Sequence, residues 1–312
     1  FIVGKTASCA AMALTVGLYA WPAHAHAVAV GCVVALTALS YAGIQKSALL
    51  TRVIVAVVLA VLAMVVVVVL GFGDVDGSRL TVGRDVAAYG VLQAAGLLFF
   101  AFAGYARIAT LGEEVRDPAT TIPRATRISL GIALAIYLLV ATAVLGELGS
   151  SELAYADAPL AEAVRAAGFP ALAPAVSVGA AVGALGALLA LLLGVSRTML
   201  AMARDRHLPH ALAAVHPRRG IPHRAELTVG AVVAVATAVA DIRSAIGFSS
   251  FGVLLYYAIA NASALTLGGR RLLPAIGLIG CLTLAFTLPL ASVLAGTAVV
   301  LIGMIAYAYG RN

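Results

Sequence analysis

Long apolar runs alternate with short polar connections along the whole chain. A helix of about 20 apolar residues is long enough to cross the hydrocarbon core of a bilayer, which is about 30 Å thick. Windows close to that length lie at residues 1–20, 26–44, 52–71, 88–112, 127–147, 172–201, 225–240, 244–267, 272–288 and 290–308. Only Pro289 separates the last two windows. The pattern predicts an all-α membrane protein with about ten transmembrane helices in one transmembrane domain, residues 1–312.

The composition supports a membrane protein and argues against other classes. Hydrophobic residues make up 63% of the chain, charged residues make up 11%, and the mean hydropathy is +1.08. A soluble core cannot hide so much apolar surface, whereas a bilayer can. The formal net charge is +7, but the basic residues are spread over the connections and form no basic arm, which argues against a nucleic-acid partner. Cys9, Cys32 and Cys281 lie in apolar runs and are expected to pack as small side chains, so no metal and no cofactor is predicted.

The placement of lysine and arginine predicts an orientation. If the first window starts in the cytoplasm, most basic residues fall in the cytoplasmic connections. The opposite side then holds Arg79, Arg84, Arg165 and Arg243. Because cytoplasmic loops carry an excess of lysine and arginine, both visible ends are expected in the cytoplasm. The sequence predicts a multi-pass protein of the bacterial inner membrane.

The run FFAFAGYARIATLGEEVRDPATTIPRA, residues 99–125, places a glycine and an arginine inside an apolar window. Gly104 either lets a neighbouring helix approach closely or marks a helix break that frees backbone groups toward a cavity. Arg107 lies about six residues before Glu113, which places it roughly 9 Å inside the cytoplasmic end of the window. Its side chain either extends back toward Glu113 or Glu114 or faces protein, water or a ligand. These residues by themselves leave both pairs of alternatives open.

Polar residues in two other windows are candidates for a functional role. Ser249 and Ser250 interrupt an apolar window, where their hydroxyls either bond back to their own helix or line a pathway. Arg197 is expected to pair with Asp205 or another loop acid near a cytoplasmic gate, in a structural or gating role. Every histidine lies in a connection or at the end of a window, so no serine and histidine share a depth as a membrane protease would require. With no glycine-rich phosphate loop either, the chain is not expected to be an enzyme.

The run at residues 99–125 resembles the sixth helix and following loop of the amino acid–polyamine–organocation (APC) permeases. In that family a phenylalanine-rich helix with a central glycine leads to an acid pair, then to Asn/Asp-Pro and Ile-Pro-Arg. The matching residues here are Phe99, Phe100, Phe102, Gly104, Glu113, Glu114, Asp117, Pro118, Ile122, Pro123 and Arg124. GVSRTMLAMARDRHLPHALAAVH (194–216) is similar to the eighth helix and its loop, AIGFSSFGVLLYYAIANASALTL (245–267) to the tenth helix, and GKTASCAAMAL (4–14) to the third. The resemblance covers essentially the whole chain.

The resemblance implies a leucine-transporter-like fold, in which two inverted repeats of five helices precede a final helix pair. Residues 1–71 would then be the remainder of the first repeat, residues 88–267 the second repeat, and residues 272–308 the final pair. About ten of an expected twelve helices are present by this comparison, and the first two, which include a broken helix, are expected to be absent. Without them the chain as given is not expected to transport.

The resemblance also implies secondary active transport of amino acids by alternating access around a site at mid-membrane. The residues expected at the substrate are Phe102, Ala103, Gly104, Tyr105, Arg107, Ser249 and Ser250. Arg107 is our own hypothesis, in which its charge opposes a substrate carboxylate or acts as a fixed internal cation. The residues expected at a gate or in a structural role are Glu113, Glu114, Arg197 and Asp205. Two departures bear on the substrate and the coupling ion. Ala106 stands where many relatives carry an acid, and Val55 stands near the lysine of some proton-coupled relatives.

Three functions stay open at this point. The first is an amino acid permease, whose coupling ion is a proton or another ion and whose oligomeric state the sequence does not give. The second is a truncated membrane remnant that does not transport. The third is a carrier of polyamines or other organocations.

Overall fold

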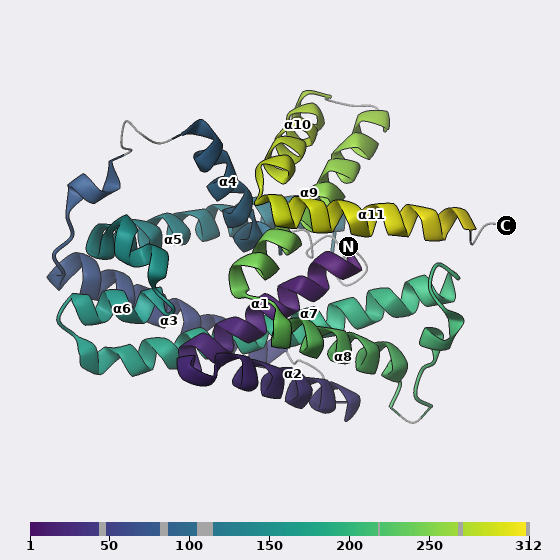
Figure 1. Ribbon diagram of the computed structural model, residues 1–312, viewed down its shortest axis with the longest axis horizontal. Helices are drawn as coiled ribbons and strands as arrows, with labels where there is room; N and C mark the ends of the chain where they lie inside the picture. Colours follow the sequence, from purple (N-terminus) through teal and green to yellow (C-terminus); the bar gives the residue numbers. More distant parts are fainter. Residues whose placement is uncertain (44–47, 82–86, 105–114, 218, 268–270, 310–312) are drawn as a thin grey trace. The chain divides into compact units, whose positions relative to one another are not determined.

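The computed structural model describes residues 1–43, 48–81, 87–104, 115–217, 219–267 and 271–309, and these form helices and no strand (Figure 1). The α-helices are α1 (Ile2–Ala20), α2 (Ala25–Tyr41), α3 (Ala48–Phe72), α4 (Ala88–Leu98), α5 (Pro118–Tyr155), α6 (Pro159–Ala166), α7 (Ala173–Arg204), α8 (His223–Val239), α9 (Ile242–Thr266), α10 (Leu272–Thr287) and α11 (Leu290–Tyr309). Short 3₁₀ helices are η1 (Pro22–His24), η2 (Gly77–Leu80), η3 (Phe99–Phe102), η5 (Pro170–Leu172) and η6 (His210–Ala213).

The predicted all-α membrane class is confirmed. Among the described residues, six helical segments are long and apolar enough to cross a bilayer: Ile2–Ala20, Pro22–Tyr41, Leu49–Phe72, Pro118–Tyr155, Pro170–Arg204 and Ile242–Thr266. A further pair, Leu272–Thr287 and Leu290–Ile305, meets these criteria jointly and is bent by 115° at its break. Each of the ten predicted windows overlaps one of the α-helices, while the number of membrane crossings stays a prediction.

Helix α3 exposes most of its apolar surface on the outside of the protein. Its window has a hydropathy of 3.6, yet only 17% of that window is buried within the protein. Valines and leucines along it, such as Val53, Val67 and Leu70, are exposed. In water such a face would be unstable, so these side chains are suited to lipid.

The helix predicted at residues 127–147 is longer than its window. α5 begins at Pro118, because a proline fits the first turn of a helix, where its missing N–H needs no partner. It continues to Tyr155 through a kink at Gly149, whose φ of +71° favours glycine. The extension beyond residue 147 contains Glu152, and a hydropathy window excludes such a charged residue.

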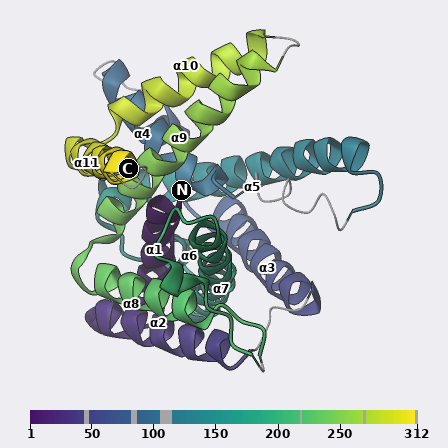
Figure 2. The ribbon, with the colours of Figure 1, turned by 90° about the vertical axis from the view of Figure 1, so that its right-hand side faces the viewer.

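The chain forms two compact units. Unit 1 comprises Phe1–Ile54, Ala87–Phe100 and Ala181–Asn312. Within it, α1 packs against α2, α8 and α9, and α2 lies beside α8 (Figure 2). Small residues allow close approach, because a Cβ added at Gly4 of α1 would lie 3.4 Å from the Cα of Gly252 on α9. This α1–α9 contact therefore depends on glycine on both helices.

Unit 1 contains two apolar clusters. One joins α1, α2, α7 and α8 through Cys9, Ala13, Leu14, Ala29, Val33, Leu188, Leu192, Val195, Val229 and Val233. The other joins α9 and α10 with the end of α4 through Phe251, Leu254, Ala285, Leu288, Leu97 and Phe99. The second cluster holds the last turn of α4 against α9.

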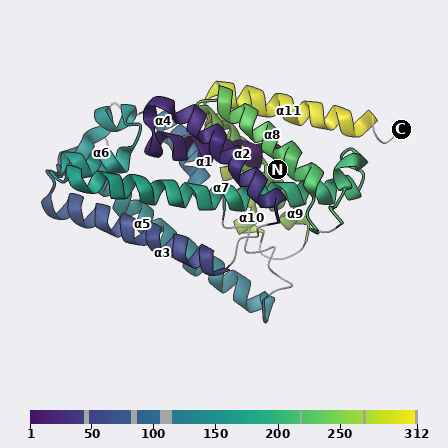
Figure 3. The same ribbon diagram turned by 90° about the horizontal axis from the view of Figure 1, so that it is seen from below.

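Unit 2 comprises Val55–Val86 and Ala101–Ala180. In it α6 and η5 lead into the start of α7 (Figure 3). A Cβ at Gly179 would lie 3.0 Å from Val61 Cβ, so the start of α7 approaches α3 closely. Arg79 of η2 donates hydrogen bonds to the carbonyl oxygens of Gly146 and Glu147, which secures the connection after α3 to α5.

Asp241 caps the first turn of α9. Its carboxylate accepts a hydrogen bond of 2.9 Å from the Ser244 N–H, and the side-chain and backbone bonds from Ser244 hold the pKa of Asp241 below its ordinary value. The stability from this lowered pKa is therefore present above the unfolded-state pKa of about 3.9 and is lost as the pH falls through the lower folded-state pKa. Asp241→Ala is expected to lower the free energy of unfolding at neutral pH by about 1 kcal/mol, measured by thermal unfolding in detergent. Asp241→Asn is the control, since it keeps a cap without the titration, and equal unfolding temperatures for Asp241→Ala and the unmodified protein would contradict this account.

Candidate functional site

The helix that carries the phenylalanine-rich motif is interrupted. The α-helix of α4 ends at Leu98, the chain continues as a 3₁₀ helix from Phe99 to Phe102, and Ala103 and Gly104 form a turn. The end of an α-helix leaves carbonyl groups without a partner in the helix. A membrane accommodates such groups only where they face protein or a cavity. The interruption is therefore the feature of this span that can receive a polar ligand.

Gly104 does not pack against a neighbouring helix. The residue is exposed, and a Cβ added to it would meet no described atom within 4 Å. In the first interpretation, Gly104 allows a neighbouring helix to approach closely. The described part of the chain holds no such contact at Gly104. Among the described residues the space beside Gly104 is open, which fits the other interpretation, in which the backbone at Gly104 must be approachable.

Aromatic side chains flank the interruption on both sides. In unit 1, the ring of Phe99 meets Tyr257 of α9 edge to face, with centroids 5.7 Å apart. In unit 2, Phe102 meets Tyr137 of α5 at 5.2 Å, and the Tyr137 hydroxyl donates to the Ala101 carbonyl oxygen over 3.3 Å. The sequence analysis missed both tyrosines, although a polar tip within an apolar window is a signal for each.

Serine 249 connects two helices of unit 1. The hydroxyls of Ser249 on α9 and Ser8 on α1 are 2.6 Å apart and form a buried hydrogen bond. This bond links helices that already approach closely at Gly4 and Gly252. Ser249 therefore has a structural partner on another helix and does not depend on a bond within its own helix.

Serine 250 lies on the face of α9 that meets α4. Gly247, Ser250 and Tyr257 are spaced by three and seven residues and so share one face of the helix. A Cβ at Gly247 would lie 3.6 Å from Leu97 Cδ2, and Tyr257 contacts Phe99. Ser250 thus lies between two contacts with the last turn of α4. It is fully buried, and its hydroxyl has no hydrogen-bond partner among the residues the structure describes.

We expect the two serines to respond differently to alanine. Ser249→Ala breaks a buried hydrogen bond and should destabilise the protein by about 1 kcal/mol, whereas Ser250→Ala removes a buried hydroxyl without a described partner and should leave stability equal or higher. If Ser250 serves the ligand, Ser250→Ala should still raise the substrate concentration for half-maximal uptake. Thermal unfolding and uptake assays on the same preparations separate the two effects. A large loss of stability in Ser250→Ala alone would contradict the assignment.

Several predicted residues are not brought together. Tyr105, Arg107, Glu113 and Glu114 lie outside the described residues. The turn from Phe102 to Gly104 belongs to unit 2, whereas Ser249 and Ser250 belong to unit 1, and each unit is described by itself. That these residues share one substrate site stays a prediction.

The predicted gate residues Arg197 and Asp205 are both exposed. The charge of Arg197 on α7 acts on the carboxyl group of Glu226 in the first turn of α8. Asp205 lies just after the end of α7, where its backbone N–H donates to the Ala201 carbonyl oxygen over 3.0 Å. The pairing predicted for Arg197 with Asp205 or another loop acid stays a prediction.

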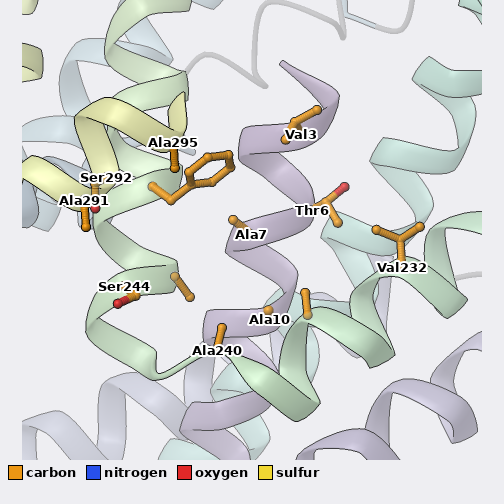
Figure 4. A pocket seen from close by; sticks show the side chains of 13 residues that line it. Val3, Thr6, Ala7, Ala10, Val232, Ala240, Ser244, Ala291, Ser292 and Ala295 are labelled. Atoms are coloured by element: carbon orange, nitrogen blue, oxygen red, sulfur yellow. The ribbon is translucent and has the colours of Figure 1, made fainter. Parts of the chain in front are cut away.

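A pocket of about 400 Å³ lies in unit 1 between α1, α8, α9 and α11 (Figure 4). Small and apolar side chains form most of its wall, and Thr6, Ser244 and Ser292 contribute hydroxyls. The Thr6 hydroxyl already donates to the Ile2 carbonyl oxygen over 2.9 Å. None of the lining residues is charged, and neither Ser249 nor Ser250 is among them. The pocket therefore does not supply the charges that an ammonium and a carboxylate group require.

Known proteins resemble this chain over nearly its full length. A family model described as amino acid permease matches residues 2–309. An uncharacterized transporter of Mycobacterium tuberculosis is 70% identical over 316 residues, which cover all of this chain and 72% of that protein. The branched-chain amino acid permease BcaP of Bacillus subtilis is 25% identical over 88% of this chain and 62% of its own length. The chloroplastic cationic amino acid transporter 7 of Arabidopsis thaliana is 30% identical over 64% of this chain and 36% of its own length.

These matches confirm the resemblance that the motifs at residues 99–125, 194–216 and 245–267 indicated. They agree with the membrane-length helices and with the interruption after α4. The chain belongs to the amino acid permease family of the APC superfamily and is a multi-pass membrane protein.

Proposed function

We propose that this chain forms the transport core of a secondary transporter that moves amino acids across the cytoplasmic membrane by alternating access. The observation that carries the proposal is the stretch from Phe99 to Gly104, the interruption, where the chain leaves α-helical geometry and a Cβ at Gly104 would meet no described atom within 4 Å. Interrupted helices at mid-membrane are the sites where transporters of this architecture bind substrate and ions. Family membership alone would support transport without indicating a site.

The substrate would bind at the interruption through the groups common to all amino acids. The end of α4 carries the partial negative charge of a helix C-terminus, which suits an ammonium group. In transporters of this architecture, a half-helix that starts after such a break presents its positive end to the substrate carboxylate. Phe102 and Tyr137 would screen the bound molecule from water, since their rings meet beside the turn.

The substrate side chain is expected to be uncharged. Neither the interruption, residues 99–104, nor helix α9 contains an aspartate or a glutamate. A second cationic group, as in a diamine or a basic amino acid, would lack a counter-charge there, and an unpaired buried charge is costly. This favours an amino acid with an apolar side chain over the polyamine alternative.

Uptake assays test the proposal. The permease that contains this chain would be purified, reconstituted in liposomes and supplied with radiolabelled leucine. We expect saturable uptake that excess unlabelled leucine abolishes, and that putrescine or arginine at the same concentration leaves largely unchanged. Failure to take up any of a panel of amino acids above protein-free liposomes would refute the proposal. Competition by putrescine alone would support an organocation carrier in its place.

A further inference from the structure

A polar site lies in unit 1 where α2, α7 and α8 meet. Its cavity has a volume of about 10 Å³ and is lined by Thr37, Ser40, Leu192, Glu226 and Val229. That volume is about the minimum that holds one water molecule. α2 and α8 pack side by side at this place (Figure 2). They come close enough that a Cβ at Gly230 would lie 3.0 Å from Thr37 Cβ.

Two buried oxygen atoms on this cavity have no described partner. Glu226 is 6% exposed and Ser40 is 4% exposed. Neither Glu226 Oε2 nor Ser40 Oγ has a hydrogen-bond partner within the described ranges. Buried polar atoms in proteins are satisfied by a protein group or by ordered water, because leaving them unpaired costs free energy. The cavity is therefore suited to a small polar species that hydrogen-bonds to both the Glu226 carboxyl group and the Ser40 hydroxyl group.

The size and chemistry of the site favour a proton together with one water molecule. Metal cations bound by oxygen atoms in proteins usually take about six ligands, and a cavity for one water cannot supply them. Leu192 and Val229 present only hydrocarbon, and the nearby positive charge of Arg197 opposes a second cation. The apolar wall favours the neutral carboxyl group, whereas the guanidinium group favours the carboxylate, so both protonation states have a stabilising neighbour.

Histidines connect this site to the loop before α8. His223 lies one turn before Glu226 on α8, and its buried Nδ1 has no partner in the described part of the protein. The rings of His223 and His216 meet with centroids 5.8 Å apart, and His216 meets Tyr41 of α2 at 6.4 Å. Arg219 donates to the Tyr41 carbonyl oxygen over 2.7 Å. Titratable groups therefore extend from the loop to within one turn of the cavity.

The other elements packed against α8 carry further titratable groups. α7 contributes Arg197, whose charge acts on Glu226. α1 contributes Cys9 to the shared apolar cluster, and the charge of Lys5 acts on Cys9. η6 contributes His210, which is exposed, and η6 also accepts a hydrogen bond from Arg224 through a backbone carbonyl. Among these, Arg197 is the charge that acts on the carboxyl group of Glu226.

We propose that Glu226 is the proton-binding residue of the permease, with Ser40 and one water molecule as its hydrogen-bond partners. The inference deepens the proposed function, on which it rests, by assigning the proton as coupling ion. A proton that arrives from the loop would bind Oε2 and turn this atom from an acceptor into a donor. The hydrogen bonds across the α2–α8 contact would then reverse direction. Loading and release of the proton would thereby bias how these two helices pack.

The transport test compares Glu226→Gln with the unmodified protein in liposomes. We expect an inward proton gradient to accelerate leucine uptake severalfold in the unmodified protein and to have no effect in Glu226→Gln. Exchange of internal for external leucine should persist in the variant, because exchange needs no net proton movement. Glu152→Gln, at an exposed acid on α5, is the matched control and should keep its response to the gradient. An unchanged response in Glu226→Gln, or no response in the unmodified protein, would overturn the proposal.

A spectroscopic test does not depend on transport. The infrared difference between acidic and neutral pH should show the C=O band of a buried protonated carboxyl group, and Glu226→Gln should lack this band. Where Glu226→Gln does not fold, Ser40→Ala serves instead and should move the midpoint of the band by roughly one pH unit. A band that persists in Glu226→Gln, or an unmoved midpoint in Ser40→Ala, would refute the site. A correctly assigned band in a protein that moves no amino acid would support the proton site and contradict the proposed function.

Discussion

Gly104→Leu is expected to reduce amino acid uptake about tenfold or more, the change that a loss of ~1.4 kcal/mol in binding free energy produces. The chain leaves α-helical geometry before this residue, and a Cβ added to it would meet no described atom within 4 Å. A leucine side chain would occupy the space through which a ligand must reach the backbone. Because that side chain meets no described neighbour, the variant should still fold and reach the membrane.

Two controls separate ligand access from general damage. Gly104→Ala adds one methyl group in open space and should reduce uptake much less than leucine does. Gly31→Leu adds the same bulk on α2, at another glycine where a Cβ would meet no described atom within 4 Å. It should leave uptake near normal. Uptake by Gly104→Leu equal to that of the unmodified protein would contradict the site.

Gly17→Ala is expected to destabilise the protein by about 3 kcal/mol, near the upper end of the usual cost of overpacking. A Cβ at Gly17 of α1 would lie 2.7 Å from the carbonyl carbon of Ala25, where α2 begins. The clash is with backbone atoms, so no side-chain rotation relieves it. The corner between α1 and α2 would have to open, and this would disturb the apolar cluster that these helices share with α7 and α8.

Thermal unfolding in detergent measures this effect directly. Gly31→Ala is the control, since alanine in an open helix position should be neutral or up to about 1 kcal/mol more stable than glycine. An unfolding temperature for Gly17→Ala equal to that of the unmodified protein would show that the corner is not as tightly packed as described. The prediction concerns folding, so its failure would leave the substrate site unaffected.

The sequence alone was sufficient to predict the class of fold, because a helix that crosses a bilayer needs about 20 consecutive apolar residues. Windows such as 52–71 and 244–267 fall on α3 and α9 for this reason. The predicted ends of the helices were less accurate, because hydropathy averages do not detect the residues that cap a helix. Pro118 starts α5 and Asp241 starts α9 through local backbone chemistry that such averages ignore.

The candidate site was predictable in part. The motif at residues 99–125 placed an interruption near Gly104, and the structure has a 3₁₀ helix and a turn directly before and at this residue. The early end of the α-helix at Leu98 was not predictable, because phenylalanine and alanine are compatible with an α-helix. The proposed role of Arg107 rests on sequence alone, since this residue lies outside the described ranges.

Contacts between distant segments were beyond the sequence. Ser8 and Ser249 meet because glycines on α1 and α9 allow their backbones to approach, and a single sequence does not show which glycines face each other. In the sequence, Glu226 is one of several acids near the end of an apolar window. Only the structure shows that Glu226 lines the same cavity as Ser40, which comes from a helix far away in the sequence.

The most direct test of the central claim is whether substrate protects the interruption from chemical modification. Gly104→Cys would be made in a background in which Cys9, Cys32 and Cys281 are replaced by alanine. Its reaction rate with a membrane-impermeant thiol reagent would be measured with and without saturating leucine, and Gly31→Cys would serve as the control. We expect leucine to slow modification at position 104 about tenfold or more, as it would if substrate occupied at least about 90% of the sites, and to leave position 31 unchanged. Equal rates at position 104 with and without leucine, in a protein that transports leucine, would contradict a substrate site at the interrupted helix.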